Sequence, residues 1–392
     1  MTIVDLPKTL ALGARTGPLA GFRIVDLSRV VMGPLATSIL ADQGADVILI
    51  EDPAGDTNRF MGGGPGPEFS GISLNLLRNK RSITVDLKTD DGHGVFERLL
   101  QTADGFLTTL RPGSLERAHA TYDIVRAINP DIVYCQAQGW PTSSDRADLP
   151  AYDDVIQAAS GIPEIMERTL GTPNLLPTIV ADKVSGLVLA QAMTAALLER
   201  QRTGQGQRVE VAMSDVMKAF VLTEHGAGAI ATGSNTAPGY SRILTAERRP
   251  HHTSDGLVHL LPYHPEHYAR LFQASGRPDL VGDPRYRDRQ ATIENAADLY
   301  REVRAAAASW TTAELIAFCR RNDIPATEVP GLDEILATFP VAEHPVVGEY
   351  RVIPNPVTFS RTPASLHRHA PAIGADTAEV VAETAGEERR PA

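Results

Sequence analysis

Cysteine is scarce in this chain, whose 392 residues include only Cys135 and Cys319. Two cysteines this far apart in sequence cannot build a disulfide framework or a thiolate metal cage, and their scarcity fits a reducing compartment. The first residues lack a charged segment followed by a long apolar core and a cleavage site, so we expect no export signal. These features predict a cytoplasmic protein.

Basic residues are in the minority, because 37 Lys and Arg stand against 48 Asp and Glu, for a formal net charge of -11. No sequence-wide positive field exists to attract nucleic acid or an anionic membrane. The longest apolar stretch, residues 184–198, is interrupted by polar side chains and is shorter than the about 20 residues that span a bilayer. We therefore expect no nucleic-acid partner and no membrane segment, although a local basic cluster could still bind a phosphorylated ligand.

Two familiar nucleotide motifs are also missing. After the first predicted strand the sequence SRVVMGPLATS has one glycine, where a dinucleotide fingerprint needs three. The glycine cluster at 62–66 follows no predicted strand and is not followed by Lys-Ser/Thr, so it is not a P-loop. The sequence excludes both a dinucleotide site and a nucleoside-triphosphate site.

The chain does contain a recurring strand–helix–strand pattern, in a composition that is 43% hydrophobic and typical of globular proteins. Short apolar runs predict strands, and segments with helical spacing lie between them, which is typical of βαβ units and a parallel sheet. A long helix is expected over 182–202 and a further one over 214–232, with Ser214 as its N-cap. The predicted strands are 21–28, 45–51, 81–87, 105–110, 131–139 and 207–213, and the first helices are 33–44, 90–104 and 120–130.

These elements predict an α/β fold with a doubly wound, Rossmann-like large domain and a smaller α+β domain. The small domain is expected to contain a strand at 256–263 and a helix over 312–322, where Thr311 and Glu314 form a capping-box pattern. A strand-like segment at 349–360 and a helix at 374–383 are expected to follow. The predicted ranges are 1–18 for an N-terminal extension, 19–232 for the large domain, 233–249 for a linker, 250–335 for the small domain and 336–392 for a segment returning to the large domain.

Two weaker candidate sites have simpler interpretations. His264 and His267 share a helix face near Glu266, but no further ligand is placed by spacing, so we favour solvent-facing histidines and predict no metal site. Cys135 ends a predicted strand, where nucleophiles are often found, yet free cysteine is usually buried in the core. We favour core packing for Cys135.

Basic side chains gather near the ends of predicted strands. Arg111 and Arg117 follow one strand, and Lys80, Arg81 and Lys88 lie around another. Loops at the carboxyl ends of parallel strands bind ligands in open α/β sheets, and guanidinium and ammonium groups suit phosphate recognition. The alternative is an ordinary charged surface.

Asp182 lies between an extended apolar segment and the long helix. A carboxylate at such a junction commonly caps the helix and is stabilised by its dipole. The same position suits a nucleophile whose attack creates an oxyanion beside backbone amides. Both interpretations remain open from the residues alone.

Six segments resemble, in the same order, successive blocks of the class III CoA-transferases, the family of formyl-CoA transferase and carnitine CoA-transferase. They are SRVVMGPLATSILADQGADVILIEDPAGD, RNKRSITVDLKTDDG, TLRPGSLER, AYDDVIQAASG, VADKVSG and RTGQGQRVEVAMSD. The closing APAIGADTAEVVAE is similar to the family's C-terminal end, so the resemblance covers about residues 20 to 382.

The resemblance implies that Asp182, in ADKVSG, is the nucleophile of a covalent aspartyl intermediate. It also implies that acyl-CoA and a small carboxylic acid are substrates, that no cofactor is permanently bound, and that the chain forms an interlocked homodimer. The implied CoA-binding residues are Val31, Met32, Val85, Leu87, Lys88, Thr109, Leu110, Arg111, Arg117 and Gln138, and the substrate-side candidates are Tyr152, Gly63, Gly64 and His264.

The sequence departs from the family pattern at informative positions. Asp52 replaces an arginine that many members carry, and the glycine-rich covering loop of formyl-CoA transferase is not recognisable, which disfavours oxalate. The related α-methylacyl-CoA racemases have a histidine where this chain has Tyr152, and a glutamate at the position of His264. Tyrosine, with a pKa near 10, is a poor base at neutral pH. A CoA-transferase is favoured, and racemase-type proton transfer or non-catalytic CoA binding are the alternatives.

The expected mechanism uses Asp182 as a carboxylate with an ordinary pKa of about 4, ionised at neutral pH without an activating base. Its attack on the donor thioester would lead to an aspartyl-CoA thioester, which the acceptor acid then attacks. We expect the oxyanion donors near Asp182 and the glycine cluster at 62–66.

Overall fold

The computed structural model describes residues 8–386, which form two compact units. Unit 1 comprises residues up to Ser160, Leu176–Ala219 and the residues from Leu336 onward, and unit 2 comprises Gly161–Leu175 and Phe220–Ile335. The prediction assigned residues 161–175 and 220–232 to the large domain, whereas here they pack with unit 2. Residues 233–249, the predicted linker, contain no helix or strand and belong to unit 2.

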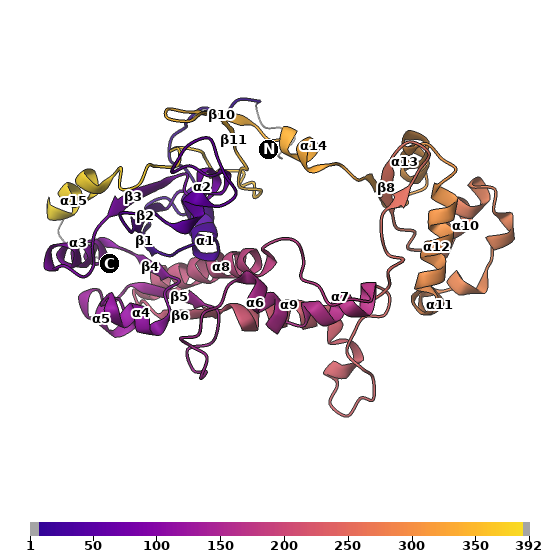
Figure 1. Cartoon of the computed structure of the whole chain (residues 1–392), viewed down its shortest axis with the longest axis horizontal. Coiled ribbons are helices and arrows are strands. Elements are labelled where there is room, and N and C mark those ends of the chain that lie inside the picture. Colours follow the sequence, from indigo (N-terminus) through magenta and orange to yellow (C-terminus); the bar gives the residue numbers. More distant parts are fainter. Residues whose placement is uncertain (1–7, 387–392) are drawn as a thin grey trace. The chain divides into compact units, whose positions relative to one another are not determined.

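Unit 1 is built on one six-stranded sheet with the order β3-β2-β1-β4-β5-β6 (Figure 1). Every neighbouring pair in this sheet is parallel. Strands β1 to β5 are buried almost throughout, as expected for a parallel sheet covered on both faces, whereas only the last two residues of the edge strand β6 are buried. The strands are β1 (Arg23–Leu27), β2 (Asp46–Glu51), β3 (Lys80–Thr84), β4 (Gly105–Thr108), β5 (Val133–Gln138) and β6 (Arg208–Ala212).

Helices cover both faces of this sheet. On one face α1 (Met32–Asp42) packs against α8 (Val180–Thr203), and α8 also contacts β5 and β6. On the other face α3 (Asp90–Thr102), α5 (Tyr122–Ile128) and α15 (Thr377–Gly386) enclose a buried cluster that includes Phe96, Phe106 and Tyr134. The predicted α/β class with a doubly wound sheet is confirmed.

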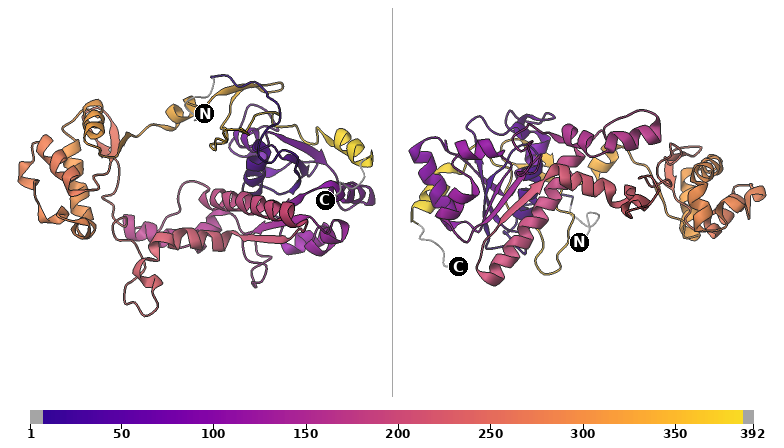
Figure 2. Two further views of the ribbon diagram at one scale, coloured as in Figure 1. Left: turned by 180° about the vertical axis from the view of Figure 1, so that it is seen from behind. Right: turned by 90° about the horizontal axis from the view of Figure 1, so that it is seen from below.

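The C-terminal segment returns to the first strands of the chain (Figure 2). Helix α15 contacts both α3 and β3, about 300 residues earlier in sequence, so it completes the hydrophobic core of unit 1. A small antiparallel pair, β10 (Val341–His344) with β11 (Gly348–Arg351), precedes it. The predicted strand at 349–360 is therefore wrong beyond Arg351, since residues 352–360 form no strand.

Unit 2 combines a three-stranded antiparallel sheet, in the order β7-β8-β9, with several helices. Its core contains Val258, Tyr268, Phe272, Val303 and Leu315. The predicted capping box is present, because the Thr311 side chain and the Glu314 side chain each bond the other's backbone N–H. The elements are α7 (Ile162–Leu170), β7 (His251–His252), β8 (Leu257–Leu260), α10 (Pro265–Ala274), α11 (Arg289–Glu294), α12 (Ala296–Ala307), α13 (Thr312–Arg321) and β9 (Ala326–Glu328).

Short helices were the main elements that periodicity did not predict. Helices of six or seven residues carry too little repeating pattern to stand out, and tertiary contacts stabilise them. Helix α9 (Met213–His225) begins one residue before Ser214, so Ser214 lies inside the helix and the N-cap prediction is wrong. The unpredicted helices of unit 1 are α2 (Gly71–Leu76), α4 (Pro112–Arg117) and α6 (Asp153–Ala159), and α14 (Leu332–Ala337) crosses the boundary between the units in sequence.

Helix α8 is the one helix among residues 8–386 whose length and hydropathy would allow it to cross a membrane. It has 24 residues and extends beyond the apolar stretch at 184–198, so its length alone does not exclude a membrane segment. Its packing decides the matter, because Leu189, Met193, Ala196 and Leu197 are buried against α1 and the sheet. Helix α8 is a core helix of unit 1.

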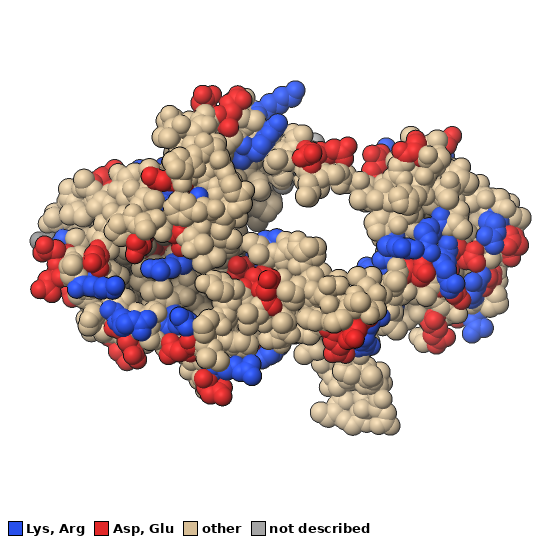
Figure 3. Space-filling model, viewed as in Figure 1, with Lys and Arg blue, Asp and Glu red and all other residues tan. Residues whose placement is uncertain are grey.

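Charged side chains of both signs are interspersed on the face of the molecule drawn in Figure 3. No extended region of a single sign occupies that face, so the formal net charge of -11 is not gathered there into one acidic surface.

Candidate active site

Two adjoining pockets lie at the carboxyl edge of the parallel sheet in unit 1. The first, of about 250 Å³, contains Asp182 and is called the aspartate pocket. The second, of about 330 Å³, contains Lys88 and Arg117 and is called the basic pocket. Arg29, Leu110 and Ser114 line both, so one extended ligand can reach from one pocket into the other.

The structure brings all ten predicted CoA-binding residues to these two pockets. Because the carboxyl ends of parallel strands meet at one edge, loops after β1, β3, β4 and β5 converge there. The aspartate pocket contains Val31, Met32, Thr109, Leu110, Arg111 and Gln138, and the basic pocket contains Val85, Leu87, Lys88, Leu110 and Arg117. Their contact with CoA remains a prediction.

Asp182 lies in the first turn of α8, which begins at Val180 after Ile179 as N-cap residue. The alternative role of Asp182 as the helix cap is therefore wrong. Its backbone N–H donates to Oδ2 of Asp153 at 3.0 Å. Burial, and secondly the negative charge of Asp153, raise the pKa of the Asp182 carboxyl to about 6. The expected ordinary pKa is thus corrected upward, and at pH 7 about nine-tenths of the carboxyl is still ionised.

Asp153 is itself buried and held by Gln157 of the same helix, α6. The Gln157 amide donates to Oδ1 of Asp153 at 2.5 Å and to the carbonyl of Thr178 at 3.1 Å. Its side-chain oxygen accepts from the N–H of Leu176 at 2.9 Å. Helix α6 therefore fixes the segment that leads into α8 and, through it, the position of Asp182.

Tyr152, the N-cap residue of α6, lines the aspartate pocket with a side chain that is 68% exposed. Its phenol is therefore available at the mouth of the pocket. Gln138 forms the inner wall, where its amide donates to the carbonyl of Trp140 at 2.7 Å and its oxygen accepts from Gln136 at 2.9 Å. Gln138 is buried and hydrogen-bonded, so it presents a fixed polar surface, whereas Tyr152 can adjust.

The cations of the two pockets form hydrogen bonds but no ion pairs within residues 8–386. Arg111 donates to the carbonyl of Asp148 at 2.5 Å, and Arg117 donates to Oγ of Ser114 at 2.9 Å. Within residues 8–386, none of Arg29, Lys88, Arg111 or Arg117 forms an ion pair. Glu51, Asp52 and Asp86 also line the basic pocket, but none of them forms an ion pair with these cations. Exposed cations that form no ion pair are available for an anionic ligand such as a phosphate.

Other predicted site residues lie elsewhere. Gly63 and Gly64 line neither pocket, and the carbonyl of Gly63 accepts from the N–H of Gly71 at 3.0 Å. His264 belongs to unit 2, where it is the N-cap residue of α10 and its ring lies 5.1 Å from that of His267. In the described part of the chain, no group of three His, Cys, Asp or Glu side chains is placed to hold a metal ion.

Two predicted members of the basic cluster are wrong. Lys80 and Arg81 open β3 and therefore lie away from its carboxyl end, where Lys88 follows. Lys80 is fully buried 3.2 Å from Asp26, and Arg81 pairs with Asp46. The core-packing interpretation of Cys135 is confirmed, since it is buried and its burial raises the pKa of the thiol to about 12.

Sequence reasoning missed Arg29 and Asp153 as site residues. Arg29 lies two residues after the end of β1 and is the one cation that lines both pockets. Its position one residue past the first predicted strand was the available signal. Asp153 is 29 residues from Asp182 in sequence, and no linear spacing reveals that their groups meet.

A parallel α/β sheet with a partly buried carboxylate and cations without ion pairs at its carboxyl edge fits an enzyme for an elongated anionic substrate. The particular family follows from comparison with known proteins. Residues 19–377 match the family described as CoA-transferase family III, and the chain belongs to this family. It is thus a class III CoA-transferase, an enzyme that transfers CoA between acyl groups.

Three similar proteins illustrate the family. A succinate–glutarate CoA-transferase of Agrobacterium fabrum is 30% identical over 97% of this chain and 98% of its own length. A Mycobacterium tuberculosis protein named "probable fatty acyl-CoA transferase" is 34% identical over 88% of this chain and 91% of its own length. A solved structure of a CaiB/BaiF family protein from Brucella suis has a TM-score of 0.79 and 27% identity, and covers 94% of this chain and 100% of its own.

Proposed function

We propose that this CoA-transferase works through a covalent intermediate on Asp182. The observation that carries the proposal is the continuity of the two pockets, because Asp182 lines the first, Lys88 and Arg117 line the second, and Arg29 lines both. CoA is anionic at its nucleotide end and carries its thioester at the other. The nucleotide would lie in the basic pocket against Lys88 and Arg117, and the thioester in the aspartate pocket beside Asp182.

The chemistry proceeds in two symmetrical halves. The Asp182 carboxylate attacks the donor thioester carbonyl, the C–S bond breaks, and a mixed anhydride and CoA thiolate form. The thiolate then attacks the Asp182 carbonyl, which releases the donor acid and leaves an aspartyl-CoA thioester. The acceptor carboxylate attacks this thioester, and the released thiolate takes the acceptor's acyl group and restores Asp182. Covalent catalysis divides one difficult exchange into easier steps.

The protein's contribution is to keep the thiolate near the anhydride. Holding CoA by its remote nucleotide makes each return of the thiolate intramolecular, which can lower the barrier by about 7–11 kcal/mol. The raised pKa of Asp182 favours its attack on the thioester, because a carboxylate that is poorly stabilised by its surroundings is a stronger nucleophile. Asp153 therefore acts as a positioning residue that bonds the Asp182 N–H and adds negative charge nearby.

The donor is an acyl-CoA, and the acceptor is a carboxylic acid. The two named relatives act on dicarboxylates and on fatty acyl groups by their names, and we propose that the acyl chain enters the aspartate pocket past Tyr152. We also propose the interlocked homodimer as the assembly, and light scattering on the purified chain would show twice the chain mass of 42.1 kDa.

The test is to trap the intermediate. The protein is incubated with acetyl-, succinyl-, glutaryl- and palmitoyl-CoA, then with hydroxylamine, and its peptides are examined by mass spectrometry. We expect a hydroxamate on Asp182 with the accepted donors and none on Asp153. Absence of an adduct, together with exchange of the substrate α-proton for deuterium from solvent, would replace this proposal with proton transfer by Asp182.

A further inference from the structure

Val30 has a backbone conformation that valine avoids. Its φ of 67° is in the left-handed region, where a β-branched side chain collides with the backbone. The other non-glycine residues with positive φ in residues 8–386 are Asn79, His119, Ala227 and Asp323, so Val30 is the one β-branched case. Such strain persists only where surrounding groups hold the residue, and it often marks functional sites.

Two side chains hold Val30 from both of its backbone polar groups. Oδ1 of Asp56 accepts the Val30 N–H at 3.0 Å, and Nδ2 of Asn58 donates to the Val30 carbonyl at 3.0 Å. Oδ1 of Asp56 also accepts the Asn58 N–H at 3.0 Å, so the pair is internally fixed. Asp56 is 9% exposed and Asn58 is 0% exposed. We call Asp56 and Asn58 the Val30 clamp.

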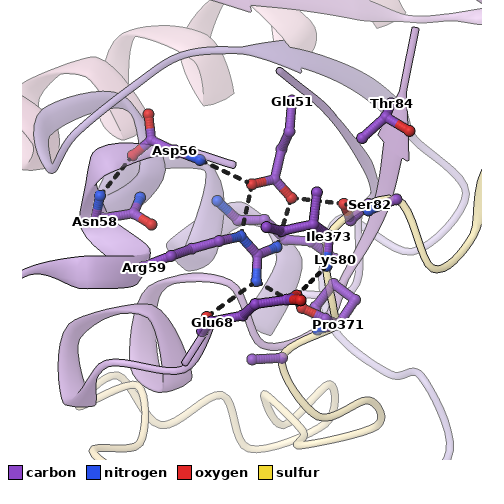
Figure 4. Close-up of polar contacts among 12 residues, drawn as sticks. Glu51, Asp56, Asn58, Arg59, Glu68, Lys80, Ser82, Thr84, Pro371 and Ile373 are labelled. Atoms are coloured by element: carbon purple, nitrogen blue, oxygen red, sulfur yellow. Dashed lines mark hydrogen bonds and ion pairs between the residues drawn. The ribbon is translucent and has the colours of Figure 1, made fainter. Parts of the chain in front are cut away.

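The clamp is anchored in the core of unit 1 (Figure 4). The Asp56 N–H donates to Oε2 of Glu51 at 3.4 Å, and Glu51 forms a fully buried ion pair with Arg59. Glu51 also accepts from Oγ of Ser82 at 2.6 Å, and Arg59 donates to the carbonyl of Pro371 at 2.9 Å. Strands β2 and β3 and the C-terminal segment therefore keep the clamp from moving with Val30.

Val30 leads directly into the aspartate pocket. Val30, Val31 and Met32 line that pocket together with Asp182, whereas Asp56 and Asn58 line neither pocket. Val31 is the N-cap residue of α1 and has no side-chain cap, so the preceding backbone sets the start of the helix. The Met32 carbonyl approaches α8 so closely that a Cβ on Gly186 would lie 2.8 Å from it. A change at Val30 would thus alter both the pocket wall and the contact with the helix of Asp182.

We infer that Asp56 and Asn58 are positioning residues for CoA. By holding Val30 in the left-handed conformation, they place Val31 and Met32 in the pocket where the proposed function puts the CoA thioester, and where the family resemblance predicts their contact with CoA. The clamp is required because valine, left free, would adopt an extended or right-handed conformation. Glycine populates positive φ freely, so a glycine at position 30 would make the clamp unnecessary.

The experiment measures CoA affinity of the full chain by calorimetry in a double-mutant cycle. Asn58→Ala should weaken CoA binding about tenfold when Val30 is present. Asn58→Ala with Val30→Gly should bind within about threefold of Val30→Gly alone, since the strain is gone. Equal weakening in both backgrounds, or unchanged affinity in a folded Asn58→Ala protein, would overturn the inference.

Three further variants separate positioning from general stability. Asn129 is a similarly buried asparagine whose side-chain amide donates to the carbonyls of Leu100 and Ala103, so Asn129→Ala should lower stability but keep CoA affinity. Asp56→Asn retains an acceptor oxygen and should bind CoA normally, whereas Asp56→Ala should not. If Asn58→Ala does not fold, the CoA affinities of Asp56→Ala and Asp56→Asn, each measured with and without Val30→Gly, test the same coupling.

CoA affinity tests the Val30 clamp, and the hydroxamate on Asp182 tests the covalent mechanism, so the two results are independent. CoA affinity is measured without turnover, so it responds to the clamp whether or not Asp182 forms a covalent intermediate. A hydroxamate on Asp182 combined with no response of CoA affinity to the clamp variants would remove this inference alone.

Discussion

The two edges of the parallel sheet carry the same kinds of charged side chains and use them in opposite ways. At the amino edge Arg23 and Arg81 share the carboxylates of Asp46 and Glu383, with Arg81 2.6 Å from Asp46 and 2.5 Å from Glu383. At the carboxyl edge Arg29, Lys88, Arg111 and Arg117 have no ion pairs among residues 8–386. Charges that satisfy one another stabilise the fold, and charges left unsatisfied are available to a ligand.

Pocket size alone would point to the wrong edge. The pocket at the amino edge has about 500 Å³, against about 250 and 330 Å³ for the two at the carboxyl edge. Its arginines Arg15, Arg23 and Arg81 all pair with Asp46. The comparison predicts that variants at the amino edge change stability, whereas variants at the carboxyl edge change CoA binding and catalysis.

The largest expected effect is at the carboxyl edge. Asp182→Asn removes the proposed nucleophile and should reduce CoA exchange at least about 1,000-fold, because the covalent route is lost. CoA affinity, measured by calorimetry, should stay within about threefold of the wild type. The matched control is Asp46→Asn at the amino edge, which should exchange CoA normally while folded. More than a tenth of wild-type activity in Asp182→Asn would contradict the covalent mechanism.

The second effect should appear at the amino edge. Arg81→Met leaves Asp46 and Glu383 with fewer partners in a largely buried site, and it should lower the free energy of unfolding by about 2–3 kcal/mol. Urea denaturation followed by circular dichroism measures this change. Lys88→Met, which removes an exposed and unpaired cation, should change stability by less than about 0.5 kcal/mol. Equal losses in the two variants would abolish the distinction between the edges.

The sequence predicted the sheet well because each strand is a short apolar run. The predicted strand 45–51 and the observed β2, Asp46–Glu51, differ by one residue. Lys80 and Arg81 show why the basic cluster was partly wrong. A strand rises about 3.3 Å per residue, so residues that are neighbours in the sequence segment 80–88 are divided between opposite edges of the sheet. Linear proximity does not distinguish the two ends of one strand.

Features that depend on tertiary contact could not be predicted from the sequence. The raised pKa of Asp182 comes from burial and from Asp153, and the clamp on Val30 comes from a 3₁₀ helix, η2 (Thr57–Phe60), that no periodicity indicates. Position in the predicted elements singled out Asp182, Lys88, Arg111 and Arg117 as candidates. The family resemblance gave them their expected roles and added the other CoA-binding residues. Their roles remain predictions that the variants described here test.

A third effect sharpens the comparison between exposed cations of the two edges. Lys88→Met should weaken CoA binding about tenfold at low salt, because a charge-assisted contact with a phosphate is lost. The difference should shrink in about 0.5 M salt, where exposed charges are screened. Arg15→Met removes an exposed cation from the amino edge and serves as the control. The same loss in Arg15→Met would mean that CoA responds to net charge and not to the basic pocket.

The smallest effect concerns the pH dependence of the carboxyl edge. The ionised form of Asp182 is the nucleophile, and burial and Asp153 raise its pKa to about 6, so kcat/KM should fall as the pH drops through about 6. Asp153→Asn removes the neighbouring charge but leaves the burial, so the pKa of Asp182 should fall without returning to its ordinary value. The acidic limb of kcat/KM should therefore move by roughly half a unit to one unit toward lower pH.

The same pKa has an opposite consequence for stability, and this gives the final check. When a carboxyl has a higher pKa in the folded than in the unfolded protein, the protein loses stability as the pH rises from about 4 to about 6. Above that pH the loss is constant. At pH 7 the free energy of unfolding of Asp182→Asn, measured by urea denaturation, should therefore exceed that of the wild type by about 1–2 kcal/mol. At pH 4 the difference should be smaller. Asp46→Asn at the amino edge should be less stable than the wild type at pH 7, because it weakens a paired network. If both substitutions destabilise the protein equally, the Asp182 carboxylate is satisfied in the fold, and the contrast between an unsatisfied carboxyl edge and a satisfied amino edge is wrong.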